Sequence, residues 1–573
     1  MGFLNQYFPV LGWLNTYTRQ TLVSDIIAGA IVAIMLIPQA MAYSLLAGLP
    51  AEYGLYASIL PLLIYSLLGN SRSLAVGPVA IASLMVSTAI STVATQGSSE
   101  YLNAAVNLSF LVGIILLFLR IIRLGAIVNF ISHSVLSGFT SAVAIIITIS
   151  QLKHVLGIEF PRATGLDQNI VALYTHLHQT NHITLLLSLL AFAILWLCKS
   201  KLCQTLNLLK LPLWFAQPLC KTGPMFVLLI GSILVWHFNL DQTKNVDTVG
   251  IVPQGLPNIG GIQIDLQLWQ QLFIPALLIA LIGFIESVSV GTALASKRRE
   301  RIDPNKELIA LGAANLGAGF SGTYPVAGGF GRSMVNHSAG AQTTIASAIS
   351  ATLVALVVAY FTPLFYYLPK AALGVIIIMA VIPLISISTF RECWKFNKAD
   401  ALTLIATFIL VLILGVELGI LFGIAISIAL LLYRASQPHI AIVGRLGNSE
   451  QFRNTARHDV KTEETVLALR VDESLYFANT RFVEKFILHQ CTDNPRFQHV
   501  VLICSAINFI DASALETLET LVSNLKDKGV ILHLSEVKGP VMDQFKNTHF
   551  LKKLEPGQVF FTTDQALRTL TKT

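Results

Sequence analysis

The hydrophobic pattern divides the chain into two parts with different character. Residues 1–434 are a series of apolar segments separated by short polar stretches, residues 461–573 have the charge and alternation of an ordinary globular domain, and 435–460 are expected to link them. About fourteen of the apolar segments are long enough to cross or enter a bilayer. The pattern therefore predicts a polytopic α-helical membrane part followed by a smaller polar domain.

Two of the apolar segments cannot be continuous helices. Each contains the sequence Pro-Val-Ala beside glycine, at Pro78 and at Pro325. Proline has no amide hydrogen and disfavours a helical conformation of the preceding residue, so each segment is expected to begin as a short strand and continue as a half-helix inside the membrane. Paired interrupted segments, one in each half of a chain, are typical of inverted repeats in transporters. Two ordinary proline kinks are the alternative interpretation.

The paired half-helices predict a binding site for an anion. A helix N-terminus presents amide groups without intrahelical partners and the positive end of the helix dipole, so two of them facing each other attract an anion and repel a cation. Arg332 follows the second break and adds a full positive charge. An arginine at mid-membrane costs about 2.5 to 3.5 kcal/mol, so it is expected to face a cavity or a partner. A structural ion pair is the alternative.

Glu286 is the acid that we expect to couple transport to protons. It is the single acid in the apolar, small-residue stretch 282–291. Protonation of a carboxylate beside an anion site removes repulsion, which would tie anion entry to a proton. The alternative is that Glu286 and Arg332 neutralise each other permanently. In the first segment, Gln39 and Tyr43 are four residues apart and share a helix face, so they either line the cavity or bond another helix.

Composition and charge agree with a membrane protein. The 573 residues are 54% hydrophobic and 12% charged, with a mean hydropathy of +0.69, which is too few charges to cover a soluble globule. A soluble enzyme is excluded, and the net charge of +7 predicts no nucleic-acid partner. Lys and Arg gather on one side of the expected segments, so the positive-inside rule predicts cytoplasmic termini in the plasma (inner) membrane.

No metal site or cofactor is predicted. His176, His178 and His182 have a spacing compatible with metal binding, but no paired cysteine or acid accompanies them, so a solvated polar loop is expected. The six cysteines show neither a Cys-x-x-Cys pair nor regular spacing, which argues against a zinc site and against a disulfide framework.

The polar domain alternates short strands with helices. The expected strands are 466–469, 500–504 and 530–534, and the expected helices are 480–489 and 512–526. This order predicts an α/β fold with a largely parallel sheet. At the start of the second helix, Ser513 and Glu516 have the spacing of a capping box, which predicts that Ser513 caps that helix.

Three stretches of the membrane part, Leu36–Tyr43, Ala51–Arg72 and Pro325–Asn336, together resemble the sulfate permease (SulP) family. The junction Ile510–Glu516 is similar to the motif of a STAS domain. The resemblance spans essentially the whole chain. It implies a seven-plus-seven inverted repeat divided into core and gate parts, a C-terminal cytoplasmic STAS domain, a homodimer, and anion transport by an elevator-like movement.

The resemblance also implies which residues bind the substrate, between the third and tenth half-helices. The positions carried over to this chain are Gln39, Tyr43, Val79, Ala80, Phe330, Gly331 and Arg332, with Glu286 as the coupling residue. Gly331 stands where many relatives have serine, which removes one side-chain contact to the substrate. Gln39 stands where some proton-coupled relatives have an acid, which shifts the coupling role to Glu286.

Sulfate import by proton symport is the favoured function. The alternatives are a sodium-coupled bicarbonate or dicarboxylate transporter, which Glu286 and Thr323 would serve, and an uncoupled anion channel or exchanger. A membrane-tethered anion sensor is a third class. Asp511 and Ser513 are the regulatory candidates of the STAS domain, but Ala512 stands where related anti-sigma-factor antagonists have a phosphorylated serine. The domain is expected to regulate transport or to bind a cytoplasmic protein.

Overall fold

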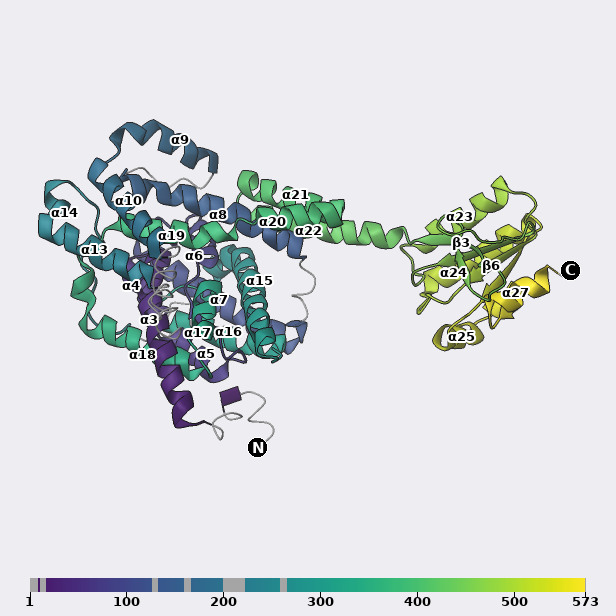
Figure 1. Ribbon diagram of the computed structural model, residues 1–573, viewed down its shortest axis with the longest axis horizontal. Coiled ribbons are helices and arrows are strands. Elements are labelled where there is room, and N and C mark those ends of the chain that lie inside the picture. Colours follow the sequence, from purple (N-terminus) through teal and green to yellow (C-terminus); the bar gives the residue numbers. More distant parts are fainter. Residues whose placement is uncertain are drawn as a thin grey trace. The chain divides into compact units, whose positions relative to one another are not determined.

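The computed structural model is a two-part molecule (Figure 1). It describes residues 9–10, 17–125, 132–158, 166–198, 222–257 and 265–571. The chain forms two compact units, one over Met1–Ser427 and the other over Ile428–Thr573. The first unit is helical and the second combines a sheet with helices, and each is described by itself.

The helical unit contains membrane-length helices together with shorter and broken ones. Its elements are α3 (Arg19–Leu46), α4 (Ala51–Tyr56), α5 (Leu60–Leu68), β1 (Val76–Gly77), α6 (Ala80–Ile90), α7 (Ser99–Ile121), α8 (His133–Leu156), α9 (Leu166–His176), α10 (His182–Leu197), α13 (Gly223–Phe238), α14 (Leu240–Thr243), α15 (Leu266–Lys297), α16 (Pro304–Phe320), β2 (Ala327–Gly328), α17 (Phe330–Ser338), α18 (Ile345–Tyr360), α19 (Lys370–Val381), α20 (Ile387–Phe396), α21 (Lys398–Leu414) and α22 (Val416–Ser436).

Fewer helices are long enough to cross a membrane than the hydrophobic pattern suggests. In the described part of the chain, seven helical stretches are long and apolar enough to cross a membrane, and two of them are composite: 51–68 consists of α4 and α5, and 370–396 contains α19 and α20. Several other apolar segments form helices such as α10, α13 and α18, of 16 residues each, which extend about 24 Å at 1.5 Å per residue. Short and interrupted helices explain why apolar segments outnumber the helices of full length.

The two predicted breaks are present, and they meet. β1 and β2 pair antiparallel, with Val76 opposite Gly328 and Gly77 opposite Ala327. Each strand leads within a few residues into a half-helix, α6 after β1 and α17 after β2. Segments from the two halves of the chain therefore form one small sheet inside the helical unit, with a half-helix leaving it from each strand.

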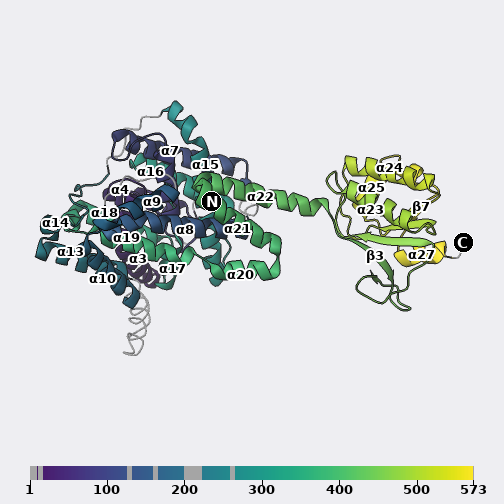
Figure 2. The same cartoon turned by 90° about the horizontal axis from the view of Figure 1, so that it is seen from above.

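The helices pack in two groups. In the first group, α7, α15 and α16 pack together, and α3 packs against α4, α17 and α18. In the second, α8 packs against α19 and α21, and α10 against α13 and α19, and Figure 2 shows α8 beside α21. Small residues permit close approach: a Cβ at Gly54 would lie 1.9 Å from the carbonyl oxygen of Ala40, and one at Gly29 would lie 2.6 Å from that of Ala346. The groups meet where α3 contacts α13 and α19 and α6 contacts α8.

The C-terminal unit is a six-stranded sheet covered on both faces. The strands are β3 (Ile440–Arg445), β4 (Phe452–Asn454), β5 (Val466–Val471), β6 (His499–Ile503), β7 (Ile531–Ser535) and β8 (Val559–Phe560), in the order β4-β3-β5-β6-β7-β8. β5 to β8 are parallel, and β3 is antiparallel to β4 and β5. One face packs on α23 (Thr480–Asp493) and α24 (Ala512–Asp527), the other on α27 (Thr563–Leu570).

The predicted strands and helices of this unit agree with the structure to within a few residues. The stretch 435–460, which the sequence pattern suggests is a linker, contains β3 and β4, and both belong to the sheet. β3 joins the sheet by antiparallel pairing with β5, and β4 joins it by antiparallel pairing with β3. A search for alternating strands and helices does not reveal such an antiparallel pair at the edge of a parallel sheet.

Buried His533 makes the stability of this sheet dependent on pH. His533, on β7, is 3% exposed; its Nδ1 accepts the amide hydrogen of Gln558 at 3.1 Å, and its Nε2 lies 3.1 Å from Nδ1 of His499 on β6. Burial, with His499 nearby, lowers the pKa of His533 to about 4. The unfolded chain, with an ordinary pKa near 6.5, therefore binds the proton first as the pH falls, so folding weakens between pH 6.5 and 4.

The expected loss from His533 at pH 5 is about 2 kcal/mol, or about 30-fold in the opening equilibrium. Hydrogen exchange of β6 and β7 in the full-length protein, corrected for the intrinsic rate, measures it between pH 7 and pH 5. His533→Asn keeps an acceptor for Gln558 and removes this titration, so the pH dependence of its protection is expected to fall to the smaller part contributed by His499, whose pKa is also lowered by burial. An equal pH dependence in the variant would assign the effect to other groups.

Candidate functional site

Side chains from three helices form hydrogen bonds to the backbone around the paired strands β1 and β2. The hydroxyl of Ser287 on α15 accepts the amide of Gly328 at 2.8 Å, and the Asn315 amide on α16 donates to and accepts from the backbone of Val326 at 3.0 and 2.9 Å. The hydroxyl of Ser333 on α17 accepts the amide of Ala75 at 2.9 Å. Irregular backbone within a membrane must find such partners, so these contacts fix both half-helix origins as one rigid support.

Both half-helices begin without a capping side chain. The N-cap residues are Val79 for α6 and Gly329 for α17, and neither provides a side-chain acceptor for the first turn. The amides at the start of each helix have no intrahelical partner. Val79, Ala80, Phe330 and Gly331 line a cavity of about 680 Å³. The cavity therefore receives two sets of amide donors and the positive ends of two helix dipoles.

Arg332 adds donors and charge to the same cavity. Its side chain is 2% exposed, and neither Nη1 nor Nη2 has a hydrogen-bond partner. The guanidinium lies against the paired strands β1 and β2. A Cβ added at Gly77 would be 3.2 Å from Nη1, and one added at Gly329 would be 3.0 Å from Nη2. An arginine fork suits an oxyanion, so an anion in this cavity would supply what the guanidinium lacks.

Glu286, on α15, lines the same cavity. Its Oε2 atom is buried and has no hydrogen-bond partner. Because this oxygen and both terminal nitrogens of Arg332 are unpartnered, the two side chains do not form the bidentate ion pair that would neutralise them permanently. An ionised carboxylate beside these hydrogen-bond donors would repel an entering anion, so the charge of Glu286 affects anion binding.

The predicted site residues come together around one cavity, which Gln39 and Tyr43 also line from α3. The sequence did not indicate the opposite wall, which α10, α13 and α19 supply. Its residues include Leu195, Cys198, Gly223, Pro224, Ile376 and Met379. They are apolar or small residues in apolar segments, so no local signal distinguishes them. The supporting residues Ser287, Asn315 and Ser333 were also missed, although polar side chains in small-residue helices are a signal that could have found them.

Four other candidate residues, Thr323 and three histidines, are not among those that line the cavity. Thr323, considered for sodium, is fully buried, and its hydroxyl donates to the carbonyl oxygen of Ala318 at 2.9 Å. The three histidines lie in helical turns and not in an open loop, since His176 ends α9 and His182 begins α10. His178 lies in a short 3-10 turn between them. Among the described residues, no cluster of three or more His, Cys, Asp or Glu is suited to a metal ion.

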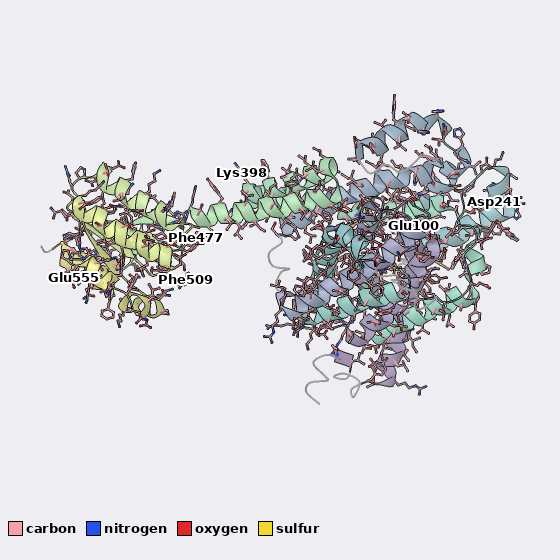
Figure 3. The ribbon with its side chains drawn as sticks, turned by 180° about the vertical axis from the view of Figure 1, so that it is seen from behind. Glu100, Asp241, Lys398, Phe477, Phe509 and Glu555 are labelled. Atoms are coloured by element: carbon pink, nitrogen blue, oxygen red, sulfur yellow. The ribbon has the colours of Figure 1, made fainter. Side chains whose placement is uncertain are left out.

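Helix α24 is capped by Asp511, so the prediction that Ser513 is the cap is wrong. Asp511 has an extended backbone, and its carboxylate accepts the amides of Ala514 at 2.7 Å and Phe477 at 2.9 Å. Ser513 lies one residue inside the helix and is exposed, where its backbone is already helical and cannot cap. Phe477 and Phe509, 73% and 50% exposed, flank this junction (Figure 3).

Gly331 leaves space for a further donor. A Cβ added there meets no atom within 4 Å. In Gly331→Ser the new hydroxyl would reach the cavity and donate to an oxyanion, so the dissociation constant of a bound oxyanion is expected to fall about three- to tenfold. Binding of a labelled oxyanion to the purified protein measures this. Gly331→Ala, which adds the carbon without the hydroxyl, is the matched control, and equal dissociation constants in the two variants would show that no hydrogen bond forms.

Comparisons of the sequence identify its relatives. Residues 22–407 match the sulfate permease family, and residues 457–566 match the STAS domain. The chain is 33% identical over 552 residues to probable sulfate transporter 4.2 of Arabidopsis thaliana, covering 94% of this chain and 80% of that protein. It is 29% identical over 585 residues to high affinity sulfate transporter 1 of Stylosanthes hamata, covering 99% of this chain and 86% of that protein.

The fold is also found in solved structures. Murine Solute Carrier 26 family member A9, an anion transporter in the inward-facing state, gives a TM-score of 0.91 at 23% identity, covering 100% of this chain and 95% of that chain. The transmembrane domain of the cyanobacterial bicarbonate transporter BicA gives 0.60 at 22% identity, covering 72% and 98%. These likenesses concern the fold, and the sequence matches decide the family. The chain therefore belongs to the sulfate permease family and is a multi-pass membrane transporter, not an enzyme, with a C-terminal STAS domain.

Proposed function

We propose that this protein imports sulfate, or a closely related inorganic oxyanion, by secondary active transport. The observation that carries the proposal is the cavity where two uncapped helix N-termini and the unpartnered Nη1 and Nη2 of Arg332 converge. Sulfate is a tetrahedral dianion whose oxygens accept hydrogen bonds from several directions, and amides and a guanidinium provide such donors. The names of the Arabidopsis and Stylosanthes relatives support sulfate as the substrate.

Protons are the proposed driving ion, and Glu286 is the proposed carrier. A dianion entering a cavity with an ionised Glu286 is repelled, whereas protonation removes one negative charge from the site. Its unpartnered Oε2 leaves the carboxyl group able to exchange a proton without first breaking an ion pair. Each inward step would then move sulfate together with at least one proton.

An elevator-like movement is the proposed way of carrying the site across the membrane. The half-helices are bonded to each other through β1 and β2 and to α15 and α16 through Ser287 and Asn315. This support would move as one body against α10, α13 and α19, whose side of the cavity is mainly apolar. An apolar wall without fixed polar bonds to the substrate suits sliding.

The proposal includes an orientation and an assembly. Both termini and the STAS domain are placed in the cytoplasm and the helical unit in the plasma (inner) membrane, because the basic run 297–301 at the end of α15 follows the positive-inside rule. A homodimer is the proposed assembly, and a cytoplasmic protein is the proposed partner of the STAS domain.

The test is labelled-sulfate uptake into proteoliposomes holding the full chain, with an inward proton gradient as the driving force. Concentrative uptake that collapses when the gradient is dissipated is the expected result. Parallel arms replace the proton gradient with sodium and add bicarbonate or succinate as competitors. Sodium-driven bicarbonate entry without sulfate uptake would change the substrate, and large currents without accumulation would indicate a channel.

A further inference from the structure

A second cavity lies along the same half-helix as the anion site. It has a volume of about 380 Å³ and is lined by polar residues that include Ser87, Thr88 and Ser91 of α6. The first cavity takes Ala80 and Ile81 from the N-terminal end of α6, and the second begins at Leu84. Three residues rise about 4.5 Å in an α-helix, so less than one helical turn separates the two cavities along α6. In the proposed orientation the second cavity faces outward.

Hydroxyl groups follow one face of α6 between the cavities. Ser83, Ser87 and Ser91 are spaced four residues apart, which places them on one side of the helix about 6 Å from one to the next. Ser87 and Ser91 line the second cavity, where the Ser91 hydroxyl donates to the carbonyl oxygen of Ser87 at 2.6 Å, and Ser83 lies in the interval between the cavities. The row therefore continues from the second cavity toward the anion site.

Two hydroxyls in this interval are buried without a partner. Ser83 and Tyr324 are both 0% exposed, and neither hydroxyl oxygen has a hydrogen-bond partner. The two side chains are close enough to interact, and Ser44 and Arg332 are also near the Tyr324 hydroxyl. Unpartnered hydroxyls at full burial are rare, and ordered water is their usual partner.

The inner end of this row reaches the charged groups of the anion site. Tyr43 of α3, Glu286 of α15 and Arg332 of α17 line the first cavity together, and Tyr43 and Arg332 are near enough to Tyr324 to interact with it electrostatically. Arg332 and Glu286 also contain unpartnered buried atoms. The unpartnered polar groups thus continue from Ser83 through Tyr324 to Arg332 and Glu286, whereas the neighbouring Ser287 is occupied with the backbone of Gly283 and Gly328.

We propose that Ser83, Ser87 and Tyr324 form a hydrated path that delivers protons from the second cavity to Glu286. A hydronium ion in the second cavity gives one proton to the first member of the path. Each water or hydroxyl then accepts one proton and releases another, and the Glu286 carboxylate ends as a neutral carboxyl group, with no net change in the path. Glu417, which also lines the second cavity, is the acid there that can pass on a proton. This inference rests on the proposed proton-driven uptake.

The path separates the route of the proton from the route of the anion. Sulfate would enter and leave the first cavity through the space between the two helix groups, while the proton crosses along α6. A residue of the path should therefore affect proton-driven uptake without affecting exchange of sulfate for sulfate, which needs no net proton movement.

Two substitutions in the full chain, reconstituted in proteoliposomes, test this separation. Ser83→Ala and Tyr324→Phe each remove one hydroxyl and little else, and each is expected to lower the initial rate of proton-driven sulfate uptake by about tenfold or more. Sulfate–sulfate exchange at equal pH on both sides is expected to remain within about twofold of wild type. Thr362→Val, which removes a buried, unpartnered hydroxyl at a position that lines neither cavity, is the matched control and should change neither rate.

The outcomes distinguish the path from the coupling. Coupled wild-type uptake with Ser83→Ala and Tyr324→Phe at full rate would overturn the path and leave the proposed function standing. Wild-type uptake that does not depend on the proton gradient would overturn both the path and the proposed proton coupling.

Radiolytic hydroxyl-radical labelling of the wild-type protein gives a second result that does not depend on any variant. Water beside Tyr324 would cause oxidation of this fully buried ring, at a level above other buried tyrosines such as Tyr65. An unmodified Tyr324 would mean that the interval is dry, and the path would be overturned.

Discussion

Arg332→Gln is expected to lower kcat/KM for sulfate uptake by about 100-fold or more. Hydrogen bonds from a charged donor contribute about 1.5 to 3 kcal/mol each, and 1.4 kcal/mol corresponds to a factor of ten. Both terminal nitrogens of Arg332 lack protein partners in the cavity, so the variant loses interactions with substrate and not with the fold. Labelled-sulfate uptake at several sulfate concentrations, together with sulfate binding to the purified protein, measures the effect.

Two control variants separate charge, geometry and folding. Arg332→Lys keeps the charge without the planar fork and is expected to retain part of the binding. Arg301→Gln removes a positive charge from an exposed position near the end of α15 and is expected to transport normally. Undiminished sulfate binding by a well-folded Arg332→Gln protein would contradict a role for this residue in the site and would assign its burial to packing.

The architecture of the site was predictable because proline and glycine act locally. Pro78 and Pro325 interrupt two apolar segments, and a chain that cannot continue as helix inside a membrane must find partners for its backbone. From these two residues follow a strand at each break, a half-helix after it, and a cavity between them. The position of Arg332 after the second break was enough to place a positive charge there.

The missing parts of the site depend on contacts between distant segments. Ser287, Asn315 and Ser333 support the paired strands β1 and β2 through backbone bonds, and nothing in their immediate neighbours specifies the strand that each one reaches. The apolar wall from α10, α13 and α19 also gives no signal in the sequence, because the residues that line a cavity and the residues that face lipid are of the same types. The prediction of the α24 cap was wrong for a more local reason. Asp511 and Ser513 are both residue types that suit an N-cap, and only the backbone angles decide between them.

Glu286→Gln is expected to abolish proton-driven accumulation of sulfate while sulfate–sulfate exchange continues. Glutamine imitates the neutral, protonated side chain in size and charge, so the anion meets no repulsion, but the residue cannot release the proton on the other side. Accumulation ratios under an inward proton gradient should therefore fall to the value set by passive equilibration. Uptake under a gradient and counterflow exchange at equal pH, measured on the same preparation, separate the two activities.

Glu100→Gln provides a matched control, because it removes an exposed acid from the first turn of α7 (Figure 3) and is expected to leave both accumulation and exchange intact. Glu286→Asp tests position, since a carboxylate one carbon shorter still titrates but reaches less far toward Arg332, and partial coupling is expected. If Glu286→Gln accumulates sulfate as well as wild type does, the proton must be carried by another group, and the carboxylate in the cavity would serve only to set its charge. Glutamine at this position leaves every hydrogen-bond donor of the half-helix ends in place. Loss of both accumulation and exchange would therefore show that the Glu286 carboxyl group itself takes part in anion binding.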